Sequence, residues 1–230
     1  MELIHSSLRE NANLRAYYRL ENGVLTADSG ANGYTLTNNN AVADGGGKFG
    51  GGADLGNANS NKGLVVVSDL GITTKVISVS MWVKLNTEIL SNSWVLFFNQ
   101  NTTQDWGIEI WYEYNAGTRR LSYRTTQSGI GSNVNIYNIS LGTDSWYHLV
   151  FTSDGTDQRA YLNGVLVGGP IAIRTSGNNI TSATSIGYYY PSNNYFASSV
   201  IDDVAIFSKA LSQAEITELY TEKSNFFLMF

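Results

Sequence analysis

The chain has 230 residues and a net charge of −5, and only 14% of its residues are charged. Its few basic residues form no stripe that could follow a phosphate backbone, so nucleic-acid binding is not expected. It contains no cysteine, which excludes disulfides and thiolate metal sites. The first residues are too few and too polar for a signal peptide, and no apolar run reaches membrane-spanning length.

Glycine, asparagine, serine and threonine are abundant, only 2 residues are proline, and 43% are hydrophobic. This mixture supplies short strands joined by tight turns and little helix. One all-β domain of this length is common. We therefore expect a lead-in segment at residues 1–13, one all-β domain at 14–225, and an apolar tail at 226–230.

From Tyr17 onward, predicted strands alternate with glycine-marked turns about every 8–12 residues, as in an antiparallel sandwich. The segment Trp106–Tyr114 alternates strictly between two faces. One face would carry isoleucine and tyrosine side chains, and the other would carry Glu109, Trp111 and Glu113. The segment Leu121–Thr126 is its expected hairpin partner.

The segment Trp146–Gly169 predicts two strands, a turn at Asp154-Gly155, a third strand, and a turn at Asn163-Gly164 into a fourth. An Asn-Gly pair suits a type I′ hairpin turn. A helix is expected over Ser212–Tyr220, where Ser212 and Glu215 fit a capping box. We expect the apolar tail to form a last edge strand, or to pair with a neighbouring subunit by strand addition.

Five segments in this order resemble the laminin G-like branch of the concanavalin A-like lectin/glucanase jelly rolls: 14–40, 48–66, 77–86, 146–169 and 201–220. The resemblance implies a two-sheet antiparallel β-sandwich, a concanavalin A-like jelly roll, with one short C-terminal helix. It also implies an extracellular or cell-surface setting, often beside other domains of a larger chain.

In relatives of this fold, a structural calcium often ties the C-terminal acidic strand to carbonyls of the glycine-rich second block and of the first strand. The resemblance assigns these positions here to Asp202, with Asp203 as the alternate carboxylate, Gly50, and a carbonyl near Glu21. By alternation, Asp202 would share a partly buried face with Val204. A buried carboxylate needs a partner, which is either a cation or, alternatively, backbone amides or Lys209.

Sugar binding is what the family resemblance implies, through aromatic faces that stack on the sugar and amides that bind its hydroxyls. Two loops offer such groups, although tyrosines and asparagines are also ordinary strand and turn residues. The candidate ligand-binding residues are Asn101, Asp105 and Trp106 in one loop and Tyr188, Tyr190, Asn193, Asn194 and Tyr195 in the other.

Catalysis is not expected. Glucanases of this fold place closely spaced carboxylates on one strand, and the nearest candidates are Glu109 and Glu113. Four residues along a strand separate them by roughly 13 Å, whereas a retaining pair needs about 5–5.5 Å. We expect both glutamates to be solvated on an exposed sheet face, and His148 to be a packed imidazole.

These observations favour a non-catalytic extracellular recognition module that binds carbohydrate, with calcium as an optional structural ion. Its partners would be glycans or cell-surface and matrix proteins, with neither nucleic acid nor membrane insertion. The alternative is a structural jelly-roll subunit that assembles into a homo-oligomer, surface layer, filament or virion. A glucanase-like hydrolase is the third and least favoured hypothesis.

Overall fold

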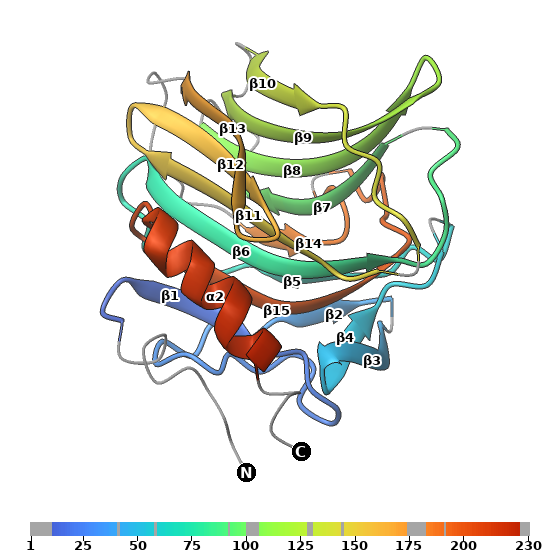
Figure 1. The fold of residues 1–230 in the computed structure, drawn as a ribbon. Helices are drawn as coiled ribbons and strands as arrows, with labels where there is room; N and C mark the ends of the chain where they lie inside the picture. Colours follow the sequence, from blue (N-terminus) through green and yellow to red (C-terminus); the bar gives the residue numbers. More distant parts are fainter. Residues whose placement is uncertain are drawn as a thin grey trace.

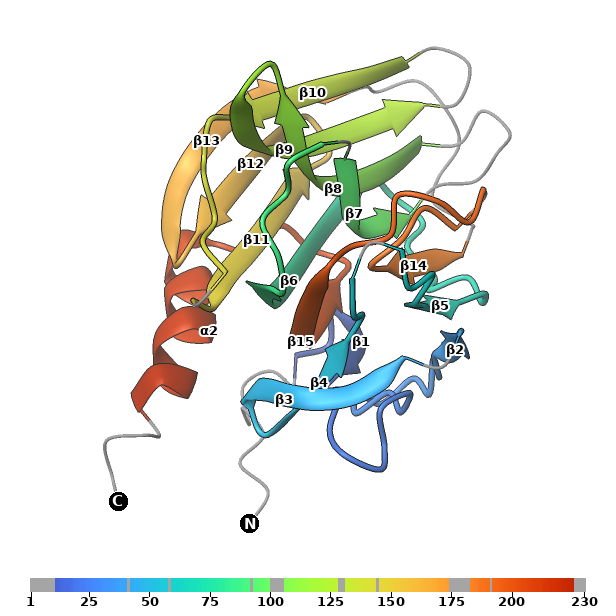
Figure 2. The ribbon, with the colours of Figure 1, turned by 90° about the vertical axis from the view of Figure 1, so that its right-hand side faces the viewer.

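The computed structural model describes residues 11–40, 42–57, 59–91, 93–99, 106–127, 131–143, 145–173, 183–190 and 192–225. Two antiparallel sheets pack face to face, and the helix α2 (Gln213–Asn225) lies outside them (Figures 1 and 2). The predicted all-β, two-sheet sandwich with a C-terminal helix is confirmed.

The first sheet has eight strands in the order β13-β12-β11-β6-β15-β4-β3, and β1 also pairs with β15. Their bounds are β1 Leu14–Tyr18, β3 Ala43–Phe49, β4 Gly51–Asp54, β6 Val76–Leu85, β11 Tyr147–Asp154, β12 Asp157–Leu162, β13 Val165–Ala172 and β15 Ser199–Phe207. The second sheet has seven strands in the order β10-β9-β8-β7-β14-β5-β2. Their bounds are β2 Thr37–Asn39, β5 Gly63–Val66, β7 Ser93–Asn99, β8 Trp106–Asn115, β9 Thr118–Gln127, β10 Gly131–Tyr137 and β14 Thr184–Ile186.

The main core lies between the two sheets and follows the two-residue period of the strands. On β6, for example, Val79 and Met81 are fully buried in this core. A second apolar cluster fills the space between the outer face of the eight-stranded sheet and α2, and it includes Phe207, Ile216 and Leu219. The eight-stranded sheet is therefore buried on both faces where α2 covers it.

The chain from β11 to β13 differs in one respect from the prediction. A single strand, β11, precedes the Asp154-Gly155 turn where two were expected, so the segment contains three strands. The second turn is as predicted: Asn163 and Gly164 have φ of 50° and 78°, the left-handed conformation that a type I′ turn requires at both positions.

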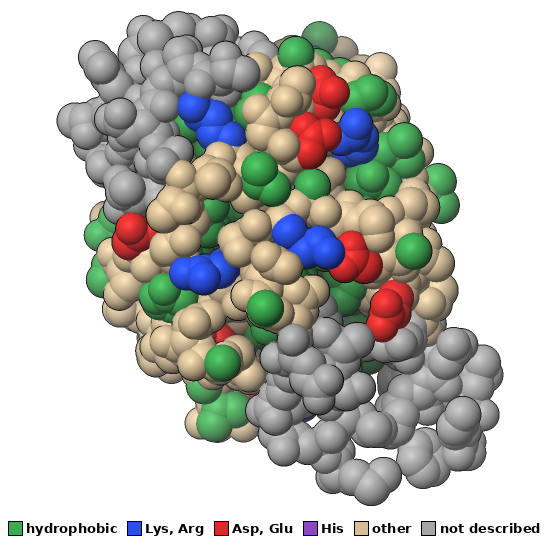
Figure 3. Space-filling view, turned by 90° about the vertical axis from the view of Figure 1, so that its left-hand side faces the viewer, with side chains coloured by type: hydrophobic (Ala, Val, Ile, Leu, Met, Phe, Trp, Pro, Cys, Tyr) green, Lys and Arg blue, Asp and Glu red, His purple; other side chains and the backbone are tan. Residues whose placement is uncertain are grey.

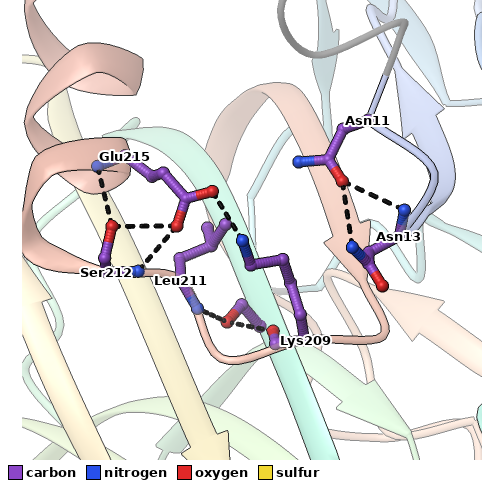
Figure 4. A network of polar contacts seen from close by, with 7 residues as sticks. Asn11, Asn13, Lys209, Leu211, Ser212 and Glu215 are labelled. Atoms are coloured by element: carbon purple, nitrogen blue, oxygen red, sulfur yellow. Dashed lines mark hydrogen bonds and ion pairs between the residues drawn. The ribbon is translucent and has the colours of Figure 1, made fainter.

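The N-terminus of α2 carries the predicted capping box (Figure 4). The backbone N–H and the hydroxyl of Ser212 both donate to Glu215 Oε2 at 2.9 Å, and the N–H of Glu215 donates to Ser212 Oγ at 3.3 Å. Lys209 Nζ lies 2.7 Å from Glu215 Oε1. The helix continues five residues beyond Tyr220, to Asn225, because nothing in that stretch interrupts it.

Replacing Glu215 with glutamine should lower the free energy of unfolding at pH 7 by up to about 1 kcal/mol. Burial acts to raise the pKa of Glu215, but the hydrogen bonds from Lys209 and Ser212 outweigh it and hold this pKa below its ordinary value. A carboxyl with a lowered folded-state pKa stabilises the fold above its unfolded pKa and loses this contribution as the pH falls. Urea unfolding from pH 7 to pH 3 should therefore show the wild type and the variant converging in acid. An equal gap at every pH would contradict this role of the charge.

A β-bulge in β15 changes the expected direction of the two aspartates. The pairing of β15 with β6 shifts between Asp202 and Ala205, and Asp203 has φ of 50°. Ile201 and Val204 both face the main core, so the extra residue turns both aspartates to the outer side. The prediction that Asp202 shares a face with Val204 is therefore wrong, and the bulge is the physical reason.

Figure 3 shows one face of the molecule on which basic and acidic side chains are interspersed among polar and apolar ones. No field of one sign dominates this face. Within the described residues, no helix has the length and apolar character needed to cross a bilayer. The tail 226–230, for which an edge strand or strand addition was predicted, lies outside the described residues.

Candidate functional site

The β8–β9 hairpin builds the outer face of the seven-stranded sheet. Its turn is Ala116-Gly117, with φ of 48° and 83°, and Asn115 pairs with Thr118. Counting outward from this turn, Glu109 pairs with Arg124, and Trp111 pairs with Ser122. The alternate residues of β8 lie in the main core, so the predicted division of this strand into two faces is confirmed.

The two glutamates of this face are buried, which corrects the expectation of solvated side chains. Glu109 is 4% exposed and Glu113 is 7% exposed. The Arg124 guanidinium contacts both: Nη1 lies 3.8 Å from Glu109 Oε2, and Nη2 pairs with Glu113 Oε1. Ser122 donates a further hydrogen bond to Glu113, and the indole N–H of Trp111 donates to Glu109. We call Glu109, Glu113 and Arg124 the carboxylate clamp.

The clamp forms because Arg124 of β9 lies on the same sheet face as Glu109 and Glu113 of β8. Arg124 extends over Trp111, with its guanidinium carbon 4.4 Å from a ring centroid of the indole. A guanidinium can bind two carboxylates and an aromatic face at once, because its donors lie in one plane. Arg124 thereby connects two glutamates that are four residues apart on β8. The spacing of the glutamates along the strand does not by itself predict this connection.

Residues 187–196, here called the tyrosine loop, fold back over β7 just beyond β14 (orange in Figure 2); Pro191 is not described. The Tyr189 N–H donates to the Asn194 carbonyl at 2.9 Å, which closes the loop. The Val95 N–H of β7 donates to the Tyr195 carbonyl at 2.9 Å. At the other end of the loop, the Gly187 N–H donates to the Leu96 carbonyl of β7 at 3.0 Å, so the sheet holds both ends of the loop.

Aromatic contacts join the tyrosine loop to the outer sheet face. The Tyr195 ring meets Trp111 edge to face at 5.1 Å between centroids, and Tyr189 lies 4.5 Å from Phe98. Burial and the negative charge of Glu109 raise the pKa of Tyr189. The same loop leaves Tyr195 46% exposed and Tyr190 38% exposed. Two tyrosines of the loop thus reach solvent, while Phe98 and Trp111 of the sheet pack against the loop.

Tyr195 has a strained backbone. Its φ is 54°, a left-handed conformation that bulky side chains rarely adopt. Such a conformation costs about 1–2 kcal/mol for a non-glycine residue. Asn193, with φ of 48°, tolerates this region better because of its short polar side chain. Strained residues gather at functional sites, which singles out Tyr195 within the loop.

The structure places the predicted ligand-binding residues in different environments. Tyr190, Asn193, Asn194 and Tyr195 all lie exposed on the tyrosine loop. Tyr188 is buried and stacks on Phe196 with centroids 5.5 Å apart, so it supports the loop rather than facing solvent.

Trp106 is fully buried in the main core. It occupies an inward position at the start of β8, so its ring cannot cover a sugar, and the prediction of a direct contact is wrong. Its two predicted companions, Asn101 and Asp105, lie outside the described residues. Trp111, Arg124 and the two glutamates were not predicted as site residues. Pairing Leu121–Thr126 against β8 from the turn outward would have placed Arg124 opposite Glu109.

The residues predicted to hold calcium meet at the β3–β4 hairpin. Asp202 Oδ2 accepts the N–H groups of Lys48 at 2.8 Å and Phe49 at 3.1 Å. Glu21 Oε2 accepts the N–H of Gly51 at 2.9 Å, and its other oxygen pairs with Arg19 at 2.7 Å. Backbone amides and an arginine therefore hold these carboxylates, as in the alternative considered for Asp202. Lys209, the other alternative partner considered for Asp202, forms an ion pair with Glu215 at the N-terminus of α2.

Asp203, the alternate carboxylate, lies beside β1. The Tyr17 hydroxyl donates to its Oδ1 at 2.6 Å, and burial, followed by the charge of Asp203, raises the pKa of Tyr17 well above its ordinary value. Within the described residues, no group of three or more acidic or histidine side chains is arranged to hold a metal ion.

A small cavity of about 10 Å³ lies between the eight-stranded sheet and α2, with Tyr17, Trp82, His148 and Asp203 in its lining. His148 is buried, as predicted, and its Nε2 lies 2.8 Å from Ser80 Oγ. The cavity has room for about one water molecule. It is too small to admit a sugar, so the tyrosine loop is the candidate functional site.

Several solved structures share this fold. The fourth domain of an extracellular arabinanase from Geobacillus stearothermophilus, in complex with arabinotriose, is 22% identical, with a TM-score of 0.71; the match covers 90% of this chain and 98% of that domain. A structure of botulinum neurotoxin type C, whose cell entry depends on interaction with two ganglioside molecules, is 15% identical with a TM-score of 0.72 over 94% of this chain.

The binding domain of botulinum neurotoxin DC in complex with rat synaptotagmin II is 16% identical, with a TM-score of 0.71 over 92% of this chain. This chain spans about half of each toxin structure, 52% in both cases. None of the curated proteins matches the chain. The family model of the concanavalin A-like lectin/glucanases superfamily matches residues 57–217, which is more than half of the chain. The chain therefore belongs to the concanavalin A-like lectin/glucanase superfamily.

Proposed function

We propose that the chain is a non-catalytic, extracellular recognition module that binds carbohydrate at the tyrosine loop. The observation that carries the proposal is the exposure of two tyrosines, Tyr190 and Tyr195, on a loop that is hydrogen-bonded to the sheet. Exposed amides of Asn193 and Asn194 lie beside them and can bind sugar hydroxyls. The arabinotriose complex of the arabinanase domain supports a carbohydrate ligand for this fold.

The carboxylate clamp argues against a glycosidase. In such enzymes two carboxyl groups flank the scissile bond, which passes between them. Here the Arg124 guanidinium contacts both Glu109 and Glu113 and fills the space between their oxygens. A glycosidic oxygen has no room there. Both side chains are also largely buried, so their role is to position the outer sheet face.

Replacing Tyr195 with glycine should weaken glycan binding about fivefold or more, because an aromatic stacking face is worth about 1 kcal/mol or more. The free energy of unfolding should stay within about 1 kcal/mol of the wild type, since glycine relieves the left-handed backbone at this position. Tyr195→Phe keeps the ring and should retain binding. Binding is measured on a glycan array, and then by calorimetry with the best ligand.

Leu90→Ala, which changes an exposed apolar residue outside the tyrosine loop, is the control. Binding that survives Tyr195→Gly and Tyr190→Ala together would remove the tyrosine loop as the site. Failure of the wild type to bind any arrayed glycan would count against the carbohydrate proposal itself.

Calcium at the β3–β4 hairpin is a further part of this proposal. A bound ion would raise the melting temperature with calcium concentration by mass action. The wild type should respond, and Asp202→Asn, which removes the central carboxylate charge, should not. No rise at millimolar calcium would show that backbone amides alone hold Asp202.

Assembly with copies of itself is the second candidate. Edge strand β13 leaves Val165, Leu166 and Ile171 exposed, and exposed apolar edge strands favour pairing between chains. Light scattering on the full chain distinguishes the two functions. An oligomer that Leu166→Lys dissociates without unfolding would favour assembly, whereas a monomer at all concentrations would dismiss it.

A further inference from the structure

We propose that the carbohydrate bound at the tyrosine loop is an acidic oligosaccharide, and that Arg120 of β9 binds the carboxylate of a uronic or sialic acid unit. The inference rests on the proposed function. It adds the chemical class of the ligand and one residue that selects it. It follows from the charged side chains on the outer face of the β8–β9 hairpin, where one guanidinium is not paired with a carboxylate of the protein.

That guanidinium belongs to Arg120, which is half-buried. Arg120 stands directly across from Glu113 in the β8–β9 pairing, so both residues lie on the outer face. Glu113 is nevertheless held by other groups: its Oε1 pairs with Arg124, and its Oε2 accepts from Ser122. Among the described residues, no carboxylate lies within ion-pair distance of Arg120, and its buried Nε donates no hydrogen bond. Arg120 therefore retains hydrogen-bonding capacity that the described protein groups do not use.

Arg124, the other guanidinium on this face, cannot take the same role. It contacts both Glu109 and Glu113, and its release to a ligand would leave two buried carboxylates without it. An isolated buried carboxylate is strongly disfavoured, so Arg124 stays in the carboxylate clamp when a ligand binds. Arg120 is not part of the clamp, so it can bind a ligand while the clamp stays intact.

The charges on this face also permit an anion. The carboxylate clamp has two formal negative charges and one positive charge, and Arg120 supplies the positive charge that balances it. A ligand carboxylate at Arg120 therefore meets no net repulsion from these groups. A planar guanidinium matches a planar carboxylate and can bind it through two parallel hydrogen bonds, each about twice as strong as a neutral one.

Arg120 lies within reach of a ligand that is bound at the tyrosine loop. The Tyr195 ring contacts Trp111, and Trp111 pairs with Ser122, which is two residues from Arg120 on β9. Trp111 and Arg120 are thus diagonal neighbours on paired strands, roughly 7–8 Å apart. β10 ends one residue short of the position opposite Arg120. A ligand with one ring on Tyr195 would pass Trp111 to reach Arg120, which requires an oligosaccharide rather than a single sugar.

The test compares ligands that differ only in charge. Oligogalacturonates and sialyllactose are each presented as the free acid and as the methyl ester, by calorimetry on the full chain. We expect the acid of at least one pair to bind about tenfold more tightly than its ester at low salt, the factor expected for hydrogen bonds to a charged group. Raising the salt concentration should narrow this difference, because screening weakens the attraction to Arg120.

Arg120→Gln should remove most of the preference for the acid, because it removes the guanidinium and leaves the carboxylate clamp in place. Arg119→Gln is the matched control on the same strand. It changes the net charge equally, but Arg119 already pairs with Glu88 at 2.6 Å, so the preference should persist. Urea unfolding checks that each variant folds. If Arg120→Gln does not fold, Arg120→Lys takes its place, and it should weaken binding of the acid but not of the ester, because lysine lacks the planar fork.

The outcomes separate this inference from the proposed function. Esters that bind as tightly as the acids in both pairs, or more tightly, would overturn the inference and leave the carbohydrate-binding proposal standing. A preference for acids that survives Arg120→Gln, or that Arg119→Gln reduces equally, would overturn the role of Arg120. Binding of no glycan at all, neutral or acidic, would overturn the proposed function, and the inference would fall with it.

Discussion

Replacing Arg124 with methionine should lower the free energy of unfolding by about 3–5 kcal/mol, the cost of removing one partner from a buried ion pair. Methionine keeps an apolar stem over Trp111, so the packing loss is small. The main loss is the cation between Glu109 and Glu113, which are both nearly inaccessible to water. Urea denaturation at pH 7 measures the change directly.

Two comparisons isolate the clamp as the cause. Arg120→Met, which removes a neighbouring cation on the same strand, should cost about 1 kcal/mol or less, because Arg124 and not Arg120 forms the ion pairs with Glu109 and Glu113. Adding Glu109→Gln and Glu113→Gln to the Arg124 variant should recover most of the loss, because no unpaired charge then remains. A loss of less than about 1 kcal/mol in Arg124→Met would show that solvent reaches these carboxylates. The claim of a buried clamp would then fail.

The sequence predicted those features of the fold that depend on local patterns. Strict alternation over Trp106–Tyr114 identified which side of β8 faces the core. The Asn163-Gly164 pair identified a hairpin turn, and Ser212 with Glu215 identified the start of α2. Each of these signals lies within a few residues of the element that it specifies, so side-chain period, turn chemistry and helix capping are sufficient.

Other features depend on residues that are distant in the sequence. The bulge at Asp203 forms where β15 meets β6 and where Tyr17 of β1 supplies a hydroxyl, and an alternation rule has no means to introduce an extra residue. The left-handed backbone of Tyr195 is likewise set by its bond to β7. Two-residue periodicity therefore assigned Asp202 to the wrong face.

The carboxylate clamp could be predicted from the sequence only in part. Its register was available from the turn at Ala116-Gly117, since each residue on β8 has one partner at an equal distance on β9. The expectation of solvated glutamates was wrong because it considered only the alternation along β8. It did not include the tyrosine loop and Arg124 of β9, which lie over the same face. Once the tyrosine loop covers the sheet, a charged residue on the outer face needs a partner, and Arg124 supplies it.

Replacing Gly47 with alanine should destabilise the protein severely, by about 3 kcal/mol or more, because the added carbon has no space and the turn around Asp202 must open. A Cβ at Gly47 would lie 1.6 Å from the Gly51 carbonyl oxygen and 2.7 Å from Asp202 Oδ2. Backbone on one side and a buried carboxylate on the other leave no flexible group that could move aside. The Lys48 and Phe49 amides would then no longer be aimed at Asp202.

Gly46 provides a matched control on the same strand, since a Cβ there meets no atom within 4 Å. Gly46→Ala should leave the free energy of unfolding within about 0.5 kcal/mol of the wild type. Both variants lose the same backbone freedom, because each replaces a glycine with alanine. Thermal and urea unfolding of the two therefore isolate the effect of the steric clash at Gly47. Equal stabilities would mean that the hairpin adapts without releasing Asp202. A loss in Gly47→Ala that adding Asp202→Asn partly reverses would show that the cost arises from the stranded carboxylate, because the neutral amide needs less compensation than a buried charge.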